Sequence, residues 1–204
     1  MSEINMWAIE EELFAQGYSL ICGVDEAGRG PLAGPVCAAV VILPRGLEIP
    51  GLNDSKKLTD KKRRELFPII KEQAIAYGIG LADHREIDEI NILQATFLAM
   101  ERAIAQLSVR PEFALVDGNR EKDFGLPVKP VVKGDSLSAN IAAASVLAKV
   151  TRDDIMEAMA LDYPQYGFEV HKGYGTKAHY EALRVHGASP IHRMTFLKKF
   201  YEQG

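Results

Sequence analysis

The sequence has no apolar run that approaches the roughly 20 residues of a membrane span, and only two of its 204 residues are cysteines. Cys22 and Cys37 both lie in apolar segments, which favours small core residues in a reducing compartment over a disulfide framework. The first residues, MSEINMWAIEEELFAQG, lack the positive start of a signal peptide and predict a short amphipathic helix instead. We therefore expect a cytoplasmic protein without a membrane segment.

An overall excess of positive charge is also missing, because the formal net charge is -4. The charge is unevenly distributed, however. Residues 1–26 hold six acids and no Lys or Arg, whereas residues 171–204 hold six Lys or Arg, two acids and four of the five histidines. Screening confines such interactions to about 10 Å, so a local basic surface can bind phosphates on an acidic protein.

The length and the 47% hydrophobic content are typical of one α/β domain with a small appendage. We expect a catalytic core over residues 1–160 and a C-terminal helical tail over residues 161–204. After Tyr163 the sequence YPQYGFEVHKGYGT alternates aromatic residues with glycine and basic groups. Such a composition suits stacking on sugars or bases, although a connector packed by its own aromatics is the alternative.

The strongest functional signal lies at residues 20–35, LICGVDEAGRGPLAGP. The apolar run that ends at Val24 predicts a buried strand, and two carboxylates, Asp25 and Glu26, follow it. Buried carboxylates are costly unless a cation meets them, and Mg²⁺ and Mn²⁺ bind carboxylate oxygens. The glycine-rich turn that follows lets backbone N–H groups approach an anion. This combination is typical of a phosphoryl-transfer site.

Two other interpretations of this stretch are an ordinary turn and a dinucleotide-binding fingerprint, which residues 28–33 match formally. The fingerprint needs a helix, but Pro31 and Pro35 flank the loop, and residues 36–43 predict a second buried strand. The two prolines and the second strand therefore exclude the dinucleotide-binding interpretation. Successive strand residues point to opposite faces, so Asp25 and Glu26 share a site only if the strand bends or ends at Glu26.

Two more acids stand at the ends of predicted elements. Asp117 follows the apolar strand 113–116, and Asp135 precedes a long helix predicted over residues 138–159, where its simplest role is to cap that helix. Strands of an α/β sheet bring their carboxyl ends together at ligand sites. Four acids in this arrangement predict a metal centre.

Periodicity predicts the remaining elements. The alternation over residues 75–81 predicts a strand with one very small face, on which a helix or loop packs closely. Apolar residues from Leu93 to Leu107 recur at helical spacing. Pro130 indicates an edge strand over residues 128–132. Thr59 is expected to cap a helix that Pro68 ends or kinks, and two last helices are expected at 177–186 and after Thr195.

Taken together, these segments resemble bacterial ribonuclease HII, the type 2 ribonuclease H. The matching pieces occur in the family's order from about residue 20 to 190: VDEAGRGPLAGPV, NDSKKL, VDGN, KGD, SANIAAASVLAKVTRD and YGFEVHKGYGT. The resemblance implies an α/β ribonuclease H-like fold. Its mixed five-stranded sheet has three antiparallel strands first and is flanked by helices, with a helical C-terminal tail.

The resemblance further implies an endonuclease that cuts RNA in RNA–DNA hybrids and nicks 5′ to single ribonucleotides in duplex DNA, as ribonucleotide excision repair requires. It assigns two divalent ions, Mg²⁺ or Mn²⁺, to Asp25, Glu26, Asp117 and Asp135. It assigns substrate binding to Gly28, Arg29, Gly30 and Tyr174. In the matching segment NDSKKL we also expect Asn53, Ser55, Lys56 and Lys57 to bind the substrate, the two lysines through phosphate because they precede the helix. The expected partner is nucleic acid, and the expected state is a monomer.

Two functions from other classes compete with this interpretation. A non-catalytic nucleic-acid binding domain has little reason to hold four converging acids, because they repel phosphate unless metal is present. A metal-dependent phosphatase for small esters does not explain the Lys56–Lys57 and Tyr174 segments. Measuring whether the protein cuts a duplex with one ribonucleotide, with and without Mg²⁺, distinguishes the three functions.

The basic residues 61–64 lie in the helix that Thr59 is expected to cap. The simplest expectation is that they form its solvated face.

Overall fold

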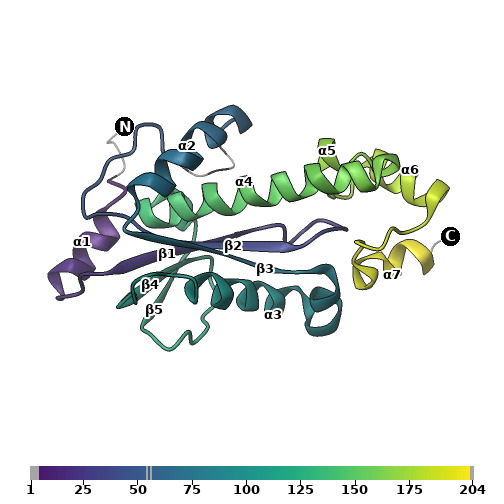
Figure 1. The fold of residues 1–204 in the computed structure, drawn as a ribbon. Helices are drawn as coiled ribbons and strands as arrows, with labels where there is room; N and C mark the ends of the chain where they lie inside the picture. Colours follow the sequence, from purple (N-terminus) through teal and green to yellow (C-terminus); the bar gives the residue numbers. More distant parts are fainter. Residues whose placement is uncertain (1–4, 54, 56, 203–204) are drawn as a thin grey trace.

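The computed structural model describes residues 5–53, 55 and 57–202, and its centre is a five-stranded sheet with helices on both faces (Figure 1). The strand order is β3 (Ala76–Ala82), β2 (Val36–Ile42), β1 (Ile21–Ala27), β4 (Phe113–Asp117) and β5 (Val128–Val131). β1, β2 and β3 pair antiparallel, whereas β4 is parallel to β1 and β5 to β4. The mixed sheet with β5 at its edge confirms the predicted fold class.

Each face of the sheet is covered by its own helical layer. Helix α3 (His84–Ile104) packs on one face, around a core that includes Val24, Val40 and Met100. Helices α4 (Ala139–Asp162) and α2 (Asp60–Gln73) cover the other face, around Val41 and Leu147. Because neighbouring residues of β2 alternate between the two cores, the strand is buried along its whole length. A short N-terminal helix, α1 (Ala8–Ala15), forms as predicted.

The very small face of β3 accepts α3, as the alternation with glycine predicts. A Cβ atom on Gly78 would lie 2.1 Å from the carbonyl oxygen of Ala103, and one on Gly80 would lie 2.0 Å from that of Ala99. No real side chain fits such a gap. The two glycines therefore let the helix backbone rest directly on the sheet.

Helix α3 begins earlier than its apolar repeat indicates. The acidic segment before Leu93 is helical from His84, because Asp83 and Glu86 form a reciprocal capping box at its start. Asn91 interrupts the helix with φ 68° and ψ 164°, and its side chain then accepts hydrogen bonds from the N–H groups of Leu93 and Gln94. A second cap thus restarts the helix where the apolar repeat begins.

Helix α2 does not end at Pro68 but continues to Gln73. A proline inside a helix costs about 3 kcal/mol, so packing must offset the loss. Leu66 and Ile70, on either side of the proline, are both fully buried, and Arg64 pairs with acids of α4. The predicted cap is present, because the Thr59 hydroxyl accepts a hydrogen bond from the Lys62 N–H.

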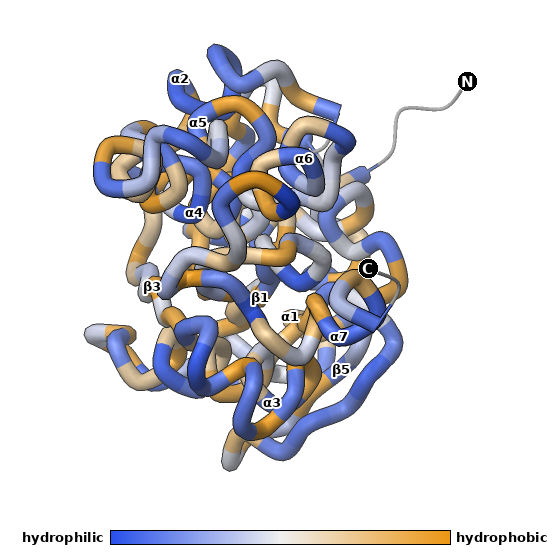
Figure 2. The backbone as a smooth tube through the Cα atoms, turned by 90° about the vertical axis from the view of Figure 1, so that its right-hand side faces the viewer, coloured by the Kyte–Doolittle hydropathy of each residue, from blue (hydrophilic) through white to orange (hydrophobic). Residues whose placement is uncertain are grey.

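The segment after α4 folds back onto the end of that helix. It contains η2 (Pro164–Tyr166), α5 (Phe168–His171), α6 (Lys177–His186) and α7 (Met194–Glu202), so both predicted helices are present. Figure 2 shows hydrophilic and hydrophobic stretches alternating around α6 and α7, as expected for helices that bury one face. Their apolar residues pack with Leu32 and Met156 in a separate core. The segment therefore packs against the loop between β1 and β2.

Two expectations from composition can be compared with the fold. Cys22 and Cys37 are buried and form no disulfide, and burial raises the pKa of each thiol to about 12. They are small core residues, as predicted. Within the described ranges, none of the helices combines the length and apolar character that crossing a membrane requires.

Candidate metal centre

Asp25 and Asp117 lie side by side at the carboxyl ends of two parallel strands. The register of β1 and β4 pairs Val24 with Val116, and each aspartate is the next residue along its strand. Both carboxylates lie on the face that α4 covers, because Gly23, two residues before Asp25, also faces α4. The parallel pairing is therefore what brings together two acids that are far apart in sequence.

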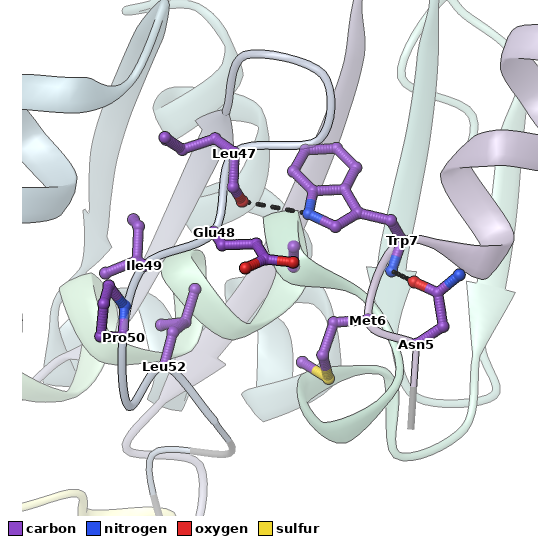
Figure 3. A pocket seen from close by; sticks show the side chains of 9 residues that line it. Asn5, Met6, Trp7, Leu47, Glu48, Ile49, Pro50 and Leu52 are labelled. Atoms are coloured by element: carbon purple, nitrogen blue, oxygen red, sulfur yellow. Dashed lines mark hydrogen bonds between the residues drawn. The ribbon is translucent and has the colours of Figure 1, made fainter. Parts of the chain in front are cut away.

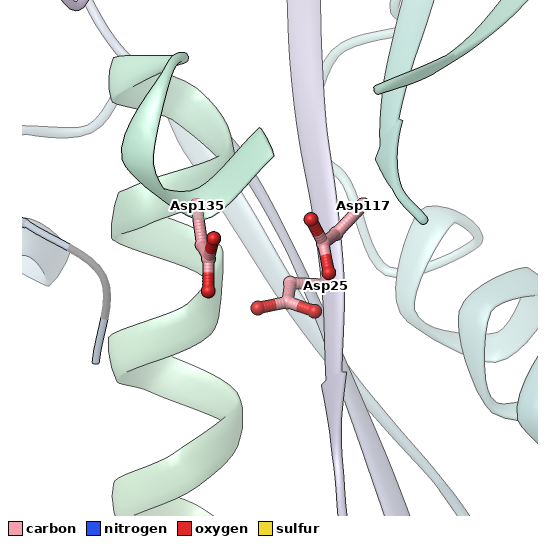
Figure 4. A group of neighbouring side chains, drawn as sticks. All are labelled: Asp25, Asp117 and Asp135. Atoms are coloured by element: carbon pink, nitrogen blue, oxygen red, sulfur yellow. The ribbon is translucent and has the colours of Figure 1, made fainter. Parts of the chain in front are cut away.

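Asp135 completes the group from a short 3-10 turn, η1 (Gly134–Ser136), that precedes α4. The Gly134 N–H donates a hydrogen bond of 2.7 Å to Oδ1 of Asp117, which ties this turn to the end of β4. Asp135 is not the cap of α4, because the Ser138 hydroxyl accepts the hydrogen bond of the Ile141 N–H instead. Its carboxylate points toward Asp25, as Figure 4 shows.

The three aspartates, Asp25, Asp117 and Asp135, form a group that fits a divalent cation. Each offers one carboxylate oxygen, and these oxygens all lie within 4.8 Å of one another. Asp25 and Asp135 are each only 4% exposed. Several carboxylates held this close repel one another, and a hard cation with a preference for oxygen ligands relieves that repulsion. The donor set therefore fits Mg²⁺ or Mn²⁺.

Glu26, the fourth predicted ligand, lies on a different side of the sheet. β1 neither ends at Glu26 nor loses its pairing there, because Glu26 still pairs with Ala38 of β2 and the strand continues to Ala27. Its side chain lies 3.4 Å from the guanidinium of Arg29 and lines a small cavity of about 40 Å³ together with Asp117. Glu26 thus adjoins the three aspartates without being one of that group, and its role as a ligand stays a prediction.

The predicted recognition loop, Gly28 to Gly30, follows directly after β1. Gly28 has φ +97°, a conformation that favours glycine, and a Cβ atom there would overlap the side chain of Arg152. Arg29 and Gly30 are exposed. The ring of Tyr174 adjoins the loop, since a Cβ atom on Gly30 would lie 3.5 Å from its Cε1 atom. The structure thus places these two predicted elements next to each other.

The predicted substrate segment 53–57 is described only in part. Asn53 and Lys57 are exposed. Ser55 is buried, and its N–H lies 3.3 Å from the Ser145 hydroxyl of α4. Arg63 donates to the carbonyls of Ser55 and Leu58, so it holds this segment and does not belong to a solvated face. Lys56 lies outside the described residues.

Two buried arginines beside the loop are residues that the sequence patterns do not reveal. Arg152 of α4 is 1% exposed, and Arg193, just before α7, is fully buried. Burial lowers the pKa of Arg193 to about 9, which leaves its guanidinium protonated at pH 7. One of the six basic residues of the tail is therefore not on its surface. A single arginine in a segment that also holds Ile191, Met194 and Phe196 is the only sequence signal for this.

Two histidines, His179 and His192, form a hydrogen-bonded chain that ends at the backbone carbonyl of Tyr174. The Ser189 N–H donates to Nδ1 of His192, so the neutral ring of His192 carries its proton on Nε2. That nitrogen lies 2.9 Å from Nε2 of His179, whose Nδ1 in turn lies 2.9 Å from the carbonyl oxygen of Tyr174. The chain is complete only when both rings are neutral.

A cavity of about 610 Å³ lies between the N-terminal segment and the loop that follows β2 (Figure 3). Trp7, Leu47 and Ile49 are among its lining residues, and the indole N–H of Trp7 donates to the carbonyl oxygen of Leu47 at 3.0 Å. Its lining includes none of the predicted site residues. The carboxylate group, rather than this cavity, is therefore the candidate site.

Comparison with known proteins agrees with the predicted family and fold. The sequence profile of ribonuclease HII matches residues 22–199. This chain belongs to the ribonuclease HII family. It is 58% identical over 187 residues to a ribonuclease HII of Desulfitobacterium hafniense, covering 92% of this chain and 72% of the relative. It is 56% identical over 198 residues to that of Clostridioides difficile, covering 97% and 77%.

Among solved structures, the ribonuclease H2 of Pyrococcus horikoshii is similar to this ribonuclease HII chain with a TM-score of 0.73 and 28% identity. The match covers 91% of this chain and all of the other. Members of the ribonuclease HII family cleave RNA in RNA–DNA hybrids, and membership makes this chain a nuclease that acts on nucleic acid. The competing interpretation as a binding domain without activity is thereby excluded.

Proposed function

We propose that this protein hydrolyses the RNA strand of RNA–DNA hybrids and also nicks duplex DNA on the 5′ side of a single embedded ribonucleotide. The products would carry 5′-phosphate and 3′-hydroxyl ends. The observation that carries the proposal is the group of Asp25, Asp117 and Asp135, whose oxygens lie within 4.8 Å of one another at the ends of β1 and β4. Nicking of this kind would assign the protein to the repair of ribonucleotides in DNA.

The proposed centre holds two divalent ions, Mg²⁺ or Mn²⁺, on the three aspartates, with Glu26 as the fourth ligand from the adjoining side. When bound, such ions activate a water for in-line attack on the phosphate and stabilise the charge on the leaving oxygen. The aspartates supply only oxygen ligands, and their own negative charge would repel the substrate in the absence of metal. This explains why the site needs no histidine or serine nucleophile.

Other residues of the chain would bind and orient the nucleic acid. Arg29 and Gly30 are exposed, and their backbone together with that of Gly28 would contact the ribose 2′-OH. The half-exposed ring of Tyr174 would stack on the neighbouring sugar. Lys57 and the exposed basic groups of the tail would contact phosphates. The protein would act as a monomer.

The test compares the protein with two variants, Asp25→Asn and Asp117→Asn, on a duplex that contains one ribonucleotide. Each variant should cut more than about a hundredfold more slowly in Mg²⁺. The loss should be this large because removing a residue that only hydrogen-bonds to a metal ligand can already cost up to about a hundredfold in activity. Both should remain folded without metal, because one charge fewer relieves repulsion within the group. Asp123 is exposed and is not one of the three grouped aspartates, so Asp123→Asn provides the matched control and should cut normally. Full activity of either triad variant would refute the assignment.

A further inference from the structure

The buried guanidinium of Arg193 donates hydrogen bonds to backbone carbonyls of the segment between β1 and β2, two of them in the recognition loop. Its three nitrogens donate to three carbonyl oxygens, those of Gly28 at 2.6 Å and of Arg29 and Gly34 at 3.0 Å. Within residues 5–53, 55 and 57–202, it forms no ion pair with a carboxylate. A charge that is fully buried is costly, so its bonds to the loop must serve the position of the loop.

These bonds also determine where the neighbouring N–H groups point. In a trans peptide the C=O and N–H bonds lie in one plane and point in opposite directions, and the described part of the chain has no cis peptide. Because the carbonyls of Gly28 and Arg29 face Arg193, the N–H groups of Arg29 and Gly30 face away from it. Both residues are exposed, and within the described chain neither N–H donates to another group.

We propose that Arg193 is a positioning residue for ribonucleotide recognition, which holds the N–H groups of Arg29 and Gly30 side by side toward the substrate. This inference rests on the proposed function, in which the loop contacts the ribose 2′-OH. A cationic donor on each carbonyl also polarises the peptide, and so strengthens the hydrogen bond that its N–H donates to the substrate. Arg193 thus acts on the substrate through the backbone, without touching it.

An arginine is needed for this role because one planar fork serves three carbonyls in different directions. A lysine would keep the charge but would concentrate its donors at one nitrogen. The Arg193→Lys variant therefore tests the orientation of the loop rather than the buried charge.

Arg152 offers a matched control from the same surroundings. It is also buried, and it donates to the carbonyls of Ala33, Pro35 and Lys172. However, the N–H groups that follow two of these carbonyls, those of Gly34 and Gly173, are already bonded within the protein. The Arg152→Lys variant should therefore lose stability as Arg193→Lys does, without altering an N–H that could face the substrate.

The experiment measures binding to two duplexes of the same sequence, one entirely DNA and one with a single ribonucleotide, in Ca²⁺ with gel analysis to verify that neither is cut. The wild type should prefer the ribonucleotide duplex. In Arg193→Lys the ratio of the two dissociation constants should fall about tenfold, the effect of weakening one or two hydrogen bonds, while affinity for the DNA duplex is kept. Arg152→Lys should keep the ratio.

The outcomes separate this inference from the proposed function. A wild type without any preference would overturn the proposed recognition of the 2′-OH itself. A preference that survives in Arg193→Lys, or that is lost equally in Arg152→Lys, would overturn the positioning role alone. If Arg193→Lys does not fold, hydrogen exchange on the wild type decides. The N–H groups of Arg29 and Gly30 should then be protected by the ribonucleotide duplex more than by DNA, and equal protection would refute the role.

Discussion

The substitution Gly23→Ala should separate the ligands of the proposed metal centre without touching any of them. Gly23 lies in β1 beneath the start of α4, and a Cβ atom there would lie 2.2 Å from the backbone carbon of Asn140 and 2.2 Å from the nitrogen of Ile141. Both atoms belong to the helix backbone, so no side chain can rotate away. The helix must therefore move away from the strand.

The size of the movement follows from the contact distances. Ordinary contact for a Cβ atom begins at 3.4 Å, so the helix start must shift by about 1.2 Å. Asp135, which enters α4 through the η1 turn, would move with it, while Asp25 stays on β1. Metal–ligand distances tolerate only about 0.2 Å, so divalent-ion affinity should fall at least tenfold. Overpacking of this kind costs about 1–3 kcal/mol of stability.

Three measurements test this prediction: urea unfolding, titration with Mn²⁺ by calorimetry, and the rate of cutting. The control is Gly125→Ala, where a Cβ atom meets nothing within 4 Å although φ is +75°. That backbone conformation costs about 1–2 kcal/mol for a residue other than glycine, so the control should lose stability but keep its metal affinity. A Gly23→Ala protein with unchanged Mn²⁺ affinity would refute the reasoning.

Three further predictions concern binding, discrimination and pH. Affinity for nucleic acid should fall with salt, with a slope of about −0.9 per phosphate contact; an affinity that is equal at low and high salt would exclude the basic residues as the binding surface. Tyr174→Ala should impair nicking at a single ribonucleotide more than cutting within a long RNA tract, whereas equal losses would indicate a role in general binding. Burial, together with the nearby His179, lowers the pKa of His192 from 6.5 to about 4, so the unfolded chain binds the proton more readily. Stability should therefore be complete above pH 6.5 and fall toward pH 4, at about 1.4 kcal/mol per unit at most. In urea unfolding, His192→Gln should flatten this dependence and exposed His186→Gln should not; an unchanged slope in His192→Gln would contradict it.

The acids of the centre could be predicted because their positions depend on strand ends, which apolar runs mark clearly. Asp25 and Asp117 follow such runs, and a parallel pair brings such ends together. The side chain of Glu26 could not be placed in the same way. Its direction depends on how far β1 extends, and pairing with β2 keeps the strand regular through Ala27, which no local pattern indicates.

The supporting residues escaped prediction for a different reason. Arg193 and Arg63 bind carbonyls of loops that are distant or irregular, and a lone basic residue has no periodicity that reveals its partner. Helices extend beyond the bounds that local signals indicate where other contacts override local preference. Pro68 is tolerated because Leu66 and Ile70 are buried beside it, and Asn91 restarts α3 through its own cap.

The bonds between Arg193 and the loop after β1 also impose an order on the synthesis of an active molecule. The two partners stand 165 positions apart along the chain, and an isolated bridge pairs Ala33 with His192 beside them. A nascent chain grows from its N-terminus, at about 5–20 residues per second, so the sheet and its carboxylates can assemble several seconds before the loop is fixed. A truncated product that ends before Arg193 would therefore carry the acids of the centre beside a loop that still lacks its fixed orientation.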